Sequence, residues 1–392
     1  MLATSELDGI RRAISDTGAD GWLLYDFHGI NPIAASVAGI SGMVTRRYFC
    51  FIPQAGNPVA ITHAIEQGPW EDWPREWPKL VYSSWRELES TLAEVVAGKR
   101  VAMEYSPGDA VPYLDRVPAG VVEMVRNAGA EVVTSADLVT RIYAVWTPEH
   151  LASHRRAAEH VARIARDAIS LAGKRARSGN PISEFELATI IRQQFADVHL
   201  YTDHGPNVSV GLNAANPHYE PTAEHSAIIN DGDIILIDLW AREMGGVYAD
   251  QTWMGSLGPP SAGDVVIWEA VRGARDAAIN VLRDHIESGQ PVTGGDADDA
   301  ARSFIVERGF GNRFIHRTGH SIDSRELHGS GPNIDNLETR DVRVLLPSVG
   351  FSIEPGIYIP GQVGMRSEVN GFVAEGSLLI TPSQPQHDLL IV

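Results

Sequence analysis

The sequence predicts two domains: a three-layer α/β domain over residues 1–145 and an α+β domain over residues 146–392. Three observations support this. The chain of 392 residues is long for a single hydrophobic core. Apolar runs alternate with helical patterns up to about residue 140, whereas strand-like pairs flank helices after residue 205. Between them, Thr147-Pro148-Glu149 combines an N-cap, a proline at the first helical position and an acidic first turn, which is a strong helix start.

Six short apolar runs predict the strands of the N-terminal domain, at residues 21–25, 48–52, 59–62, 80–83, 101–105 and 132–134. Helical periodicity predicts helices at residues 5–18, 85–97, 109–116 and 119–128. Strands separated by helices favour a sheet with helices on both faces. The domain has no GxGxxG after a strand and no GxxxxGK[ST], so a nucleotide site is not indicated.

The C-terminal domain begins with two helices and continues as strand pairs around a second pair of helices. Helices are expected at residues 148–171, 183–195, 262–288 and 294–308. Strands are expected at residues 208–210, 226–229, 234–239, 247–254, 351–353, 357–359, 364–369 and 371–374.

Charge and cysteine content exclude several classes of function. The 50 acidic and 32 basic residues give a net charge of −18, which disfavours nucleic acid and anionic membranes as partners. Because Cys50 is the one cysteine, the chain cannot form an intrachain disulfide. Cys50 lies in an apolar run, which predicts a buried thiol on a strand. The N-terminus does not resemble a signal peptide, and no stretch approaches the roughly 20 apolar residues of a membrane span. We therefore expect a cytoplasmic protein.

The segment between Gly68 and Pro78 contains three tryptophans and three prolines. This composition predicts a structured loop rather than a regular element. The favoured interpretation is an aromatic latch, Trp70–Trp77, on the surface of its own domain. The alternative is a partner-facing lip over an active site, because tryptophan is enriched at interfaces.

Two pairs of carboxylates lie on apolar strands. Asp238 and Asp250 flank a turn around residues 242–246, so a hairpin would bring them together. Glu354 and Glu368 flank a Pro- and Gly-containing stretch in the same way. Buried like charges are costly unless a cation neutralises them. Unrelated strand-end residues, or salt bridges to Arg366, are the alternatives.

Three histidines lie within a stretch of 13 residues, His316, His320 and His328. The first two have the i, i+4 spacing of zinc ligands on a helix. However, Arg317 stands where the HExxH motif requires Glu, and Gly319 disfavours a helix, so a zincin site is rejected. A single histidine is more often structural than a ligand, but three in a glycine-containing stretch favour a site.

Four carboxylates and one imidazole together suit a pair of divalent cations, since four negative charges balance two such ions. An oxygen-rich set favours hard or borderline ions such as Mn²⁺, Co²⁺, Fe²⁺ or Zn²⁺. Two ions about 3.5–4 Å apart can activate a water molecule and polarise a carbonyl group. The predicted ligands are Asp238, Asp250, His320, Glu354 and Glu368.

This ordered set resembles the pita-bread metallopeptidases, namely methionine aminopeptidase, Xaa-Pro aminopeptidase and prolidase, with creatinase as a metal-free relative. The resemblance covers roughly residues 150–392 and extends weakly to an N-terminal domain like that of creatinase and prolidase. It is closer to the proline-directed and creatinase-like branch, because methionine aminopeptidases usually lack that N-terminal domain.

The resemblance implies a role for each ligand. Asp238 would hold one metal and His320 the other, with Asp250 and Glu368 bridging them. Glu354 would bind metal and shuttle a proton while a metal-bridged hydroxide attacks the scissile carbonyl.

Four further residues match catalytic positions of the family. His218 corresponds to a histidine on the substrate side, and His328 to one that contacts the scissile carbonyl or the tetrahedral intermediate. His316 corresponds to another active-site histidine of the Xaa-Pro branch, and Arg366 to an arginine two residues before the last glutamate.

The motif spacings depart from the family pattern at two places. Asp238 to Asp250 and His320 to His328 are each one residue longer than is usual, and GHGIG is replaced by Gly-His-Ser-Ile-Asp at residues 319–323. A turn or bulge can absorb one residue without moving the ligands. The second insertion leaves the placement of His328 open, with Tyr219 as an alternative.

The resemblance implies a dinuclear-metal exopeptidase that hydrolyses Xaa-Pro bonds, as a dipeptidase or aminopeptidase. Its cofactors would be two divalent ions (Mn, Zn or Co), and its substrate a small peptide with proline in second position. A homodimer is also expected, in which the Trp70–Trp77 loop approaches the neighbouring site. The alternatives are a hydrolase or lyase acting on a small zwitterion such as creatine or ectoine, and a catalytically dead binding module.

Overall fold

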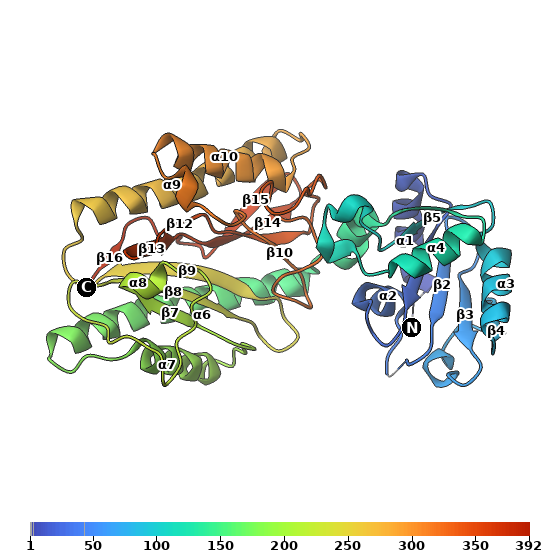
Figure 1. Cartoon of the computed structure of the whole chain (residues 1–392), viewed down its shortest axis with the longest axis horizontal. Helices are drawn as coiled ribbons and strands as arrows, with labels where there is room; N and C mark the ends of the chain where they lie inside the picture. The colour runs from blue at the N-terminus through green and yellow to red at the C-terminus, as the bar shows by residue number, and fades with distance from the viewer. Residues whose placement is uncertain (1, 3, 43) are drawn as a thin grey trace. The chain divides into compact units, whose positions relative to one another are not determined.

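The computed structural model describes residues 2, 4–42 and 44–392, and the chain divides into two compact units, Met1–Ala144 and Val145–Val392 (Figure 1). The first unit contains one mixed sheet between helices, and the second contains several sheets with helices outside them. The predicted fold class, α/β followed by α+β, is confirmed.

The first unit is built on a six-stranded sheet in the order β4-β3-β2-β1-β5-β6. Alternation along β1 sends Trp22 and Leu24 into a core with α1 and α2, and Leu23 and Tyr25 into a core with α3 and α4. This makes three layers. The bounds are α1 Thr4–Thr17, β1 Gly21–Asp26, α2 Pro32–Ala38, β2 Tyr48–Pro53, β3 Val59–His63, η1 Gly68–Trp70, β4 Lys79–Tyr82, α3 Trp85–Val96, β5 Arg100–Met103, η2 Pro107–Asp109, η3 Pro112–Leu114, α4 Ala119–Asn127, β6 Glu131–Thr134, α5 Ala136–Leu138 and η4 Val139–Tyr143.

The predicted helix at residues 109–116 is wrong. The chain forms two short 3₁₀ turns there, η2 and η3, because Pro112 removes a backbone donor and restricts the residue before it. Helix α2 was not predicted. Its start is set by Asn31, whose side chain accepts a hydrogen bond from the backbone N–H of Ala34.

The tryptophan-rich segment packs on its own unit. Trp70, Trp73 and Trp77 are buried, and successive rings meet edge to face with centroids 5.4 and 5.1 Å apart. Tyr48 on β2 extends the stack. The interpretation as an aromatic latch is therefore confirmed, although one 3₁₀ turn, η1, forms within the predicted loop. Cys50 is also fully buried, as predicted, and its burial raises the pKa of the thiol to about 12.

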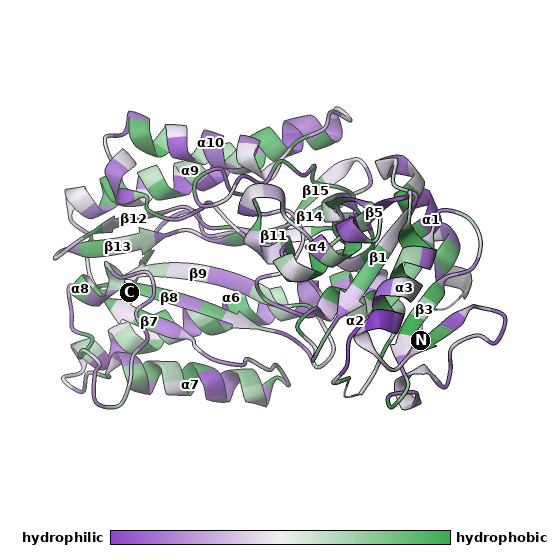
Figure 2. Ribbon diagram, turned by 45° about the vertical axis from the view of Figure 1, so that its right-hand side comes forward, coloured by the Kyte–Doolittle hydropathy of each residue, from purple (hydrophilic) through white to green (hydrophobic). Residues whose placement is uncertain are grey.

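The second unit places two sheets face to face, with a helix pair outside each. Helices α6 and α7 cover the β16-β9-β8-β7 sheet, and α9 and α10 cover the β10-β11-β14-β15 sheet and the β12-β13 hairpin (Figure 1). Hydrophobic and hydrophilic residues alternate along these helices (Figure 2). The bounds are α6 Pro148–Arg177, α7 Glu184–Asp197, β7 Asn207–Val210, α8 Gly211–Ala214, β8 Ile234–Ala241, β9 Ala249–Ser256, α9 Ala262–Glu287, α10 Gly294–Glu307, η5 Gly311–Arg313, β10 Ser321–Ile322, β11 Gly350–Ile353, β12 Gly356–Ile359, β13 Val363–Arg366, β14 Val369–Ala374, β15 Ser377–Thr381 and β16 Leu390–Ile391.

Two strand predictions in this unit need correction. Residues 226–229 form no strand but a single bridge between Ile228 and Ser183, so their backbone follows the start of α7 instead of a sheet. The strand expected at residues 364–369 divides at Ser367, whose N–H donates to Pro355 O. Strands β10, β15 and β16 were not predicted. Two of them, β10 and β16, are two residues long and depend on pairing with distant strands, whereas β15 pairs with β14 across a short turn. Among the described helices, none combines the length and apolar character needed to cross a bilayer.

A buried histidine joins α6 to the sheets. His154 Nδ1 lies 2.8 Å from Tyr248 O, and Nε2 lies 2.8 Å from Thr381 Oγ1. These partners suit a neutral ring that donates through Nδ1 and accepts through Nε2. Burial lowers the pKa of His154 to about 4.

His154 should therefore make stability depend on pH. The pKa of His154 is 6.5 in the unfolded chain and about 4 in the folded protein. Between these two pH values the unfolded chain binds a proton that the folded protein does not, so the free energy of unfolding decreases as the pH falls through this window. The full effect is roughly 3 kcal/mol. Urea unfolding at pH 7.5 and pH 5 should show a smaller loss for His154→Gln than for the wild type. Equal losses in the two proteins would contradict this assignment.

Candidate metal centre

The β8–β9 hairpin brings the two aspartates onto one face. Its antiparallel register pairs Asp238 with Thr252 and Trp240 with Asp250, so the carboxylates are diagonal neighbours. The loop between Ala241 and Ala249 joins the strands without breaking this register. Asp238 and Asp250 are both buried.

The two glutamates lie side by side at the same end of the second sheet. Glu354 directly follows β11, and Glu368 directly precedes β14, where Ile353 pairs with Val369. The β12–β13 hairpin occupies the chain between them. The predicted pairing of the carboxylates therefore holds, although each lies just outside a strand and not within one.

His320 enters the group from the segment before β10. Its Nδ1 lies 3.0 Å from Ser321 O, which favours a proton on Nδ1 and leaves Nε2 facing the carboxylates. Nε2 lies 3.3 Å from Asp250 Oδ2 and 3.5 Å from Glu354 Oε1. A backbone bond to one ring nitrogen is the usual way of orienting the other toward a metal.

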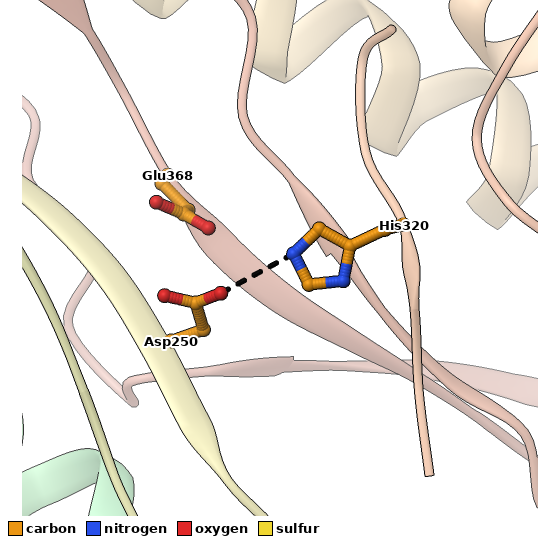
Figure 3. A group of neighbouring side chains, drawn as sticks. All are labelled: Asp250, His320 and Glu368. Carbon is orange, nitrogen blue, oxygen red and sulfur yellow. Dashed lines mark ion pairs between the residues drawn. The ribbon is translucent and has the colours of Figure 1, made fainter. Parts of the chain in front are cut away.

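Three of the predicted ligands form a compact cluster. One ligand atom each from Asp250, His320 and Glu368 lies within 4.8 Å of the other two, and the three side chains converge from different strands and loops (Figure 3). Glu354 reaches the same imidazole. Asp238 is connected through Arg366, whose Nη2 forms a very short ion pair with Asp238 Oδ2.

Burial and like charge make this cluster costly without a cation. Burial, followed by the charge of Glu354, raises the pKa of Asp250 to about 8. Burial also raises the pKa of Asp238 to about 6, although Arg366 opposes the rise. For Glu354, burial is outweighed by the charges of His320 and Arg366, which lower its pKa to about 2. A buried donor set of carboxylates and one imidazole fits divalent metal ions chemically.

Two residues that the sequence analysis missed hold the ligands in place. Thr252 Oγ1 accepts a 2.7 Å hydrogen bond from Arg366 Nε and donates a 2.7 Å bond to Glu368 Oε2. Asn370 joins the strands, because its side chain accepts from Asp250 N and donates to Asp250 O, both at 2.9 Å. The signal for Thr252 was its position two residues after Asp250, which puts both side chains on one face of the strand. Asn370 gave no comparable signal.

The segment after His320 returns His328 to the cluster. Asp323 accepts hydrogen bonds from three backbone N–H groups, those of residues 325, 326 and 330, and so folds the longer loop into a turn. The rings of His320 and His328 meet edge to face at 4.2 Å. The charge of His320, with burial, lowers the pKa of His328 to about 3, so this ring is neutral. Tyr219, the alternative, instead directs its hydroxyl to Glu184.

His316 forms part of the wall of the site. Its Nδ1 lies 2.7 Å from Arg317 O and its Nε2 lies 2.9 Å from the Tyr358 hydroxyl, so both ring nitrogens have partners. His218 is exposed and lies on a loop after α8. That loop is held by Glu184, a fully buried carboxylate at the start of α7.

Glu184 collects donors from the whole loop. It accepts hydrogen bonds from Val210 N at 2.8 Å, Ala227 N at 2.7 Å and the Tyr219 hydroxyl at 2.6 Å. The side-chain amide of Asn213 adds a further donor. The ends and the middle of the segment that carries His218 are therefore fixed to one point.

All nine predicted site residues line a single cavity of about 640 Å³. This volume is in the range of small-molecule sites. Other residues in its wall include His204, Asn216, Trp240, Arg317 and Glu338. The fold and this group of side chains together define a metal-binding hydrolase-type site between the two sheets.

Known proteins agree with that class. The profile of metallopeptidase family M24 matches residues 152–375. An Xaa-Pro dipeptidase of Lactobacillus helveticus is 37% identical over 169 residues, which are 43% of this chain and 42% of that enzyme. The uncharacterised peptidase YqhT of Bacillus subtilis is 31% identical over 65% of this chain and 67% of its own length. Dipeptidase PepE from Mycobacterium ulcerans superposes with a TM-score of 0.74 at 21% identity, covering 99% of this chain and 97% of that structure, which shows the fold.

The chain belongs to metallopeptidase family M24, a family of metal-dependent proteins with the pita-bread fold. The predicted resemblance is therefore confirmed. The match to the Lactobacillus enzyme spans less than half of that protein. The roles of individual site residues stay predictions.

Thr252 should be needed for tight metal binding. Thr252→Val keeps the shape of the side chain but removes both hydrogen bonds, leaving Glu368 and Arg366 without this partner. Loss of a group that orients ligands typically weakens metal affinity by about 10–100-fold. Calorimetric titration with Mn²⁺ should show this loss for Thr252→Val and near-normal binding for Thr252→Ser, which keeps the hydroxyl. Equal affinity of the two variants would contradict the role.

Glu184 should affect substrate binding more than the rate of the chemical step. Glu184→Gln replaces one acceptor oxygen by a donor, so it cannot satisfy all of its present donors, and the His218 loop should loosen. We expect KM to rise several-fold with a smaller change in kcat. Steady-state kinetics of Glu184→Gln and of Glu186→Gln, an exposed glutamate on the same helix, would test this. A fall in kcat at unchanged KM would contradict it.

Proposed function

We propose that this protein is a metal-dependent exopeptidase that hydrolyses Xaa-Pro dipeptides. The observation that carries the proposal is the convergence of Asp250, His320 and Glu368 within 4.8 Å at the wall of a cavity sized for a small peptide. The likeness to the Lactobacillus Xaa-Pro dipeptidase supports the substrate class. The proposed cofactor is a pair of divalent ions held by these three residues together with Asp238 and Glu354.

The chemistry needs an activated water molecule and a polarised carbonyl group. When bound, two divalent ions supply both, by lowering the pKa of water and by acting as a Lewis acid. The chain supplies the rest. In this proposal Glu354 accepts the proton of the attacking water and returns it to the leaving nitrogen. Its side chain is 13% exposed and accepts a 3.0 Å hydrogen bond from the Ser352 hydroxyl, which supports this role.

The histidines of the cavity are suited to the carbonyl oxygen and the peptide ends. The rings of His328 and His320 meet at 4.2 Å, so His328 is proposed as the hydrogen-bond donor to the carbonyl oxygen of the substrate. His218 lies on the exposed loop, where it can contact the substrate as it enters. Arg366 places positive charge beside Asp238, Glu354 and Glu368, which fixes the geometry of the carboxylates.

A short peptide suits a cavity of about 640 Å³. Its wall contains both anionic groups, such as Glu220 and Glu338, and cationic groups, such as Arg317. Such a wall can take the two charged ends of a short peptide. A hydrolase or lyase of small zwitterions is the alternative from the sequence, and the dipeptidase relatives favour the peptide. Homodimer formation, the cytoplasmic location and the identity of the ions stay predictions.

Hydrolysis of Xaa-Pro dipeptides should appear on metal addition and disappear with a chelator. The protein stripped of metal and reconstituted with Mn²⁺, Co²⁺ or Zn²⁺ would be incubated with Xaa-Pro dipeptides, Xaa-Pro tripeptides, creatine and ectoine, and release of proline or amine measured. Turnover of creatine or ectoine without release of proline would reject the proposal in favour of its alternative.

Glu354→Gln should lower kcat by about 10²–10⁴-fold, as expected for loss of a general acid–base group. Circular dichroism would establish that the variant is folded. Glu375→Gln, at an exposed carboxylate of the same unit outside the cavity, is the matched control and should remain active. A Glu354→Gln variant with normal kcat would remove the proton-transfer role.

A further inference from the structure

The first unit contains a second cavity, of about 720 Å³, lined only by residues of that unit. Four aromatic side chains and two arginines lie in its wall, and none of its described lining residues carries a carboxylate. This is unusual for a chain with a net charge of −18. The residues on which the argument depends are Tyr25, Phe27, Arg47, Tyr82 and Trp85.

Arg47 provides the charge of this cavity. It is half-buried, its guanidinium is hydrogen-bonded to the side chain of Tyr82, and no carboxylate among residues 2, 4–42 and 44–392 forms an ion pair with it. Its backbone is fixed, because the Tyr82 hydroxyl donates a 2.7 Å hydrogen bond to Arg47 O. Its positive charge acts on both Tyr25 and Tyr82 and opposes the rise in their pKa values that burial causes. The guanidinium therefore lies near both hydroxyl groups.

Glu66, whose charge acts on Tyr82 in the cavity wall, has other partners. Glu66 accepts hydrogen bonds from the backbone N–H groups of Thr45 and Arg46, both at 2.8 Å. The Thr45 hydroxyl donates a further, very short bond to it. Glu66 thus orders the loop before β2 without joining the cavity wall, and Arg47 keeps its charge for a ligand.

Large apolar side chains also contribute to the wall, beside polar residues such as Thr45, His63 and Ser83. Phe27 and Trp85 are 39% and 54% exposed, which is high for large aromatic side chains, and the guanidinium of Arg86 lies over the Trp85 ring at 4.2 Å. Val121 and Met124 of α4 add an apolar floor. Aromatic rings stack with other rings and contact apolar groups favourably.

The rim of the cavity is a strained but fixed turn. His28 has a positive φ of 58°, which is uncommon for a residue with a side chain, and Gly29 follows at 72°. Asp26 holds this conformation by accepting hydrogen bonds from Gly29 N at 3.1 Å and Asn31 N at 2.9 Å. Strain that the surrounding structure maintains is found preferentially at functional sites.

We propose that this cavity binds a small organic monoanion with a flat apolar body. Its carboxylate would pair with Arg47 in the bidentate manner that guanidinium favours, and its ring would lie against Phe27 and Trp85. A zwitterion fits less well, because the wall offers its ammonium group no carboxylate. The inference is independent of the proposed peptidase activity, since none of the residues involved lines the metal-site cavity.

Fluorine NMR with two matched probes would test the proposal on the full metal-loaded chain. 4-Fluorobenzoate should bind saturably, whereas 4-fluorobenzylamine, with the same ring and the opposite charge, should bind at least ten-fold more weakly. Arg47→Gln should weaken benzoate binding at least ten-fold. Arg75→Gln, an exposed arginine of the same unit outside the cavity, should leave it unchanged. Trp85→Ala, which removes an exposed side chain, should also weaken it.

Three results would overturn the proposal: absence of saturable benzoate binding, equal binding by Arg47→Gln and the wild type, and equal binding of the two probes. A carboxylate can also bind a metal ion, so the titration would be repeated after chelation. Binding that persists without metal supports the cavity, and binding that disappears rejects it. Peptidase activity of Arg47→Gln would be measured separately, so failure of this proposal and failure of the proposed function can be distinguished.

Discussion

The second unit depends on placing four carboxylates in a buried position between two sheets. Asp238, Asp250 and Glu368 are each at most 8% exposed, and burial raises the pKa of all three. One guanidinium, that of Arg366, faces Asp238, Glu354 and Glu368 but carries a single positive charge. Such a cluster is costly unless further positive charge is present, which agrees with the metal dependence of family M24.

Hydrogen bonds from outside the ligand set give this cluster its geometry. Thr252 connects Arg366 to Glu368, and Asn370 connects β14 to Asp250 on β9. These contacts join strands from the two different sheets, so the position of each ligand depends on how the sheets pack. Asp323 and Glu184 act on the loops in the same way, each by accepting several backbone N–H groups. A single buried carboxylate can thus order a long irregular segment.

The two units differ in how they use charge. The metal-site cavity concentrates carboxylates and histidines, whereas the wall of the cavity in the first unit has arginines and aromatic rings and none of its described lining residues is acidic. Trp70, Trp73 and Trp77, by contrast, are buried, stack on one another and stabilise the core of the first unit. Among the described tryptophans of that unit, Trp85 is the one that is more than half exposed.

The sequence by itself determined the fold class, most of the helices and strands, and the five candidate ligands, because hydrophobic periodicity and charge on apolar strands are local properties. It failed where local pattern is weak, as at residues 109–116 and 226–229, and for two-residue strands that depend on distant partners. Only the tertiary structure decided which side chains support the ligands. Thr252, Asn370 and Glu184 act on residues more than 20 positions away, and the return of His328 to His320 depends on a turn held by Asp323. Contacts of this kind arise from packing between sheets and loops, so the chain spacing gave a signal for Thr252, two residues after Asp250, but none for Asn370.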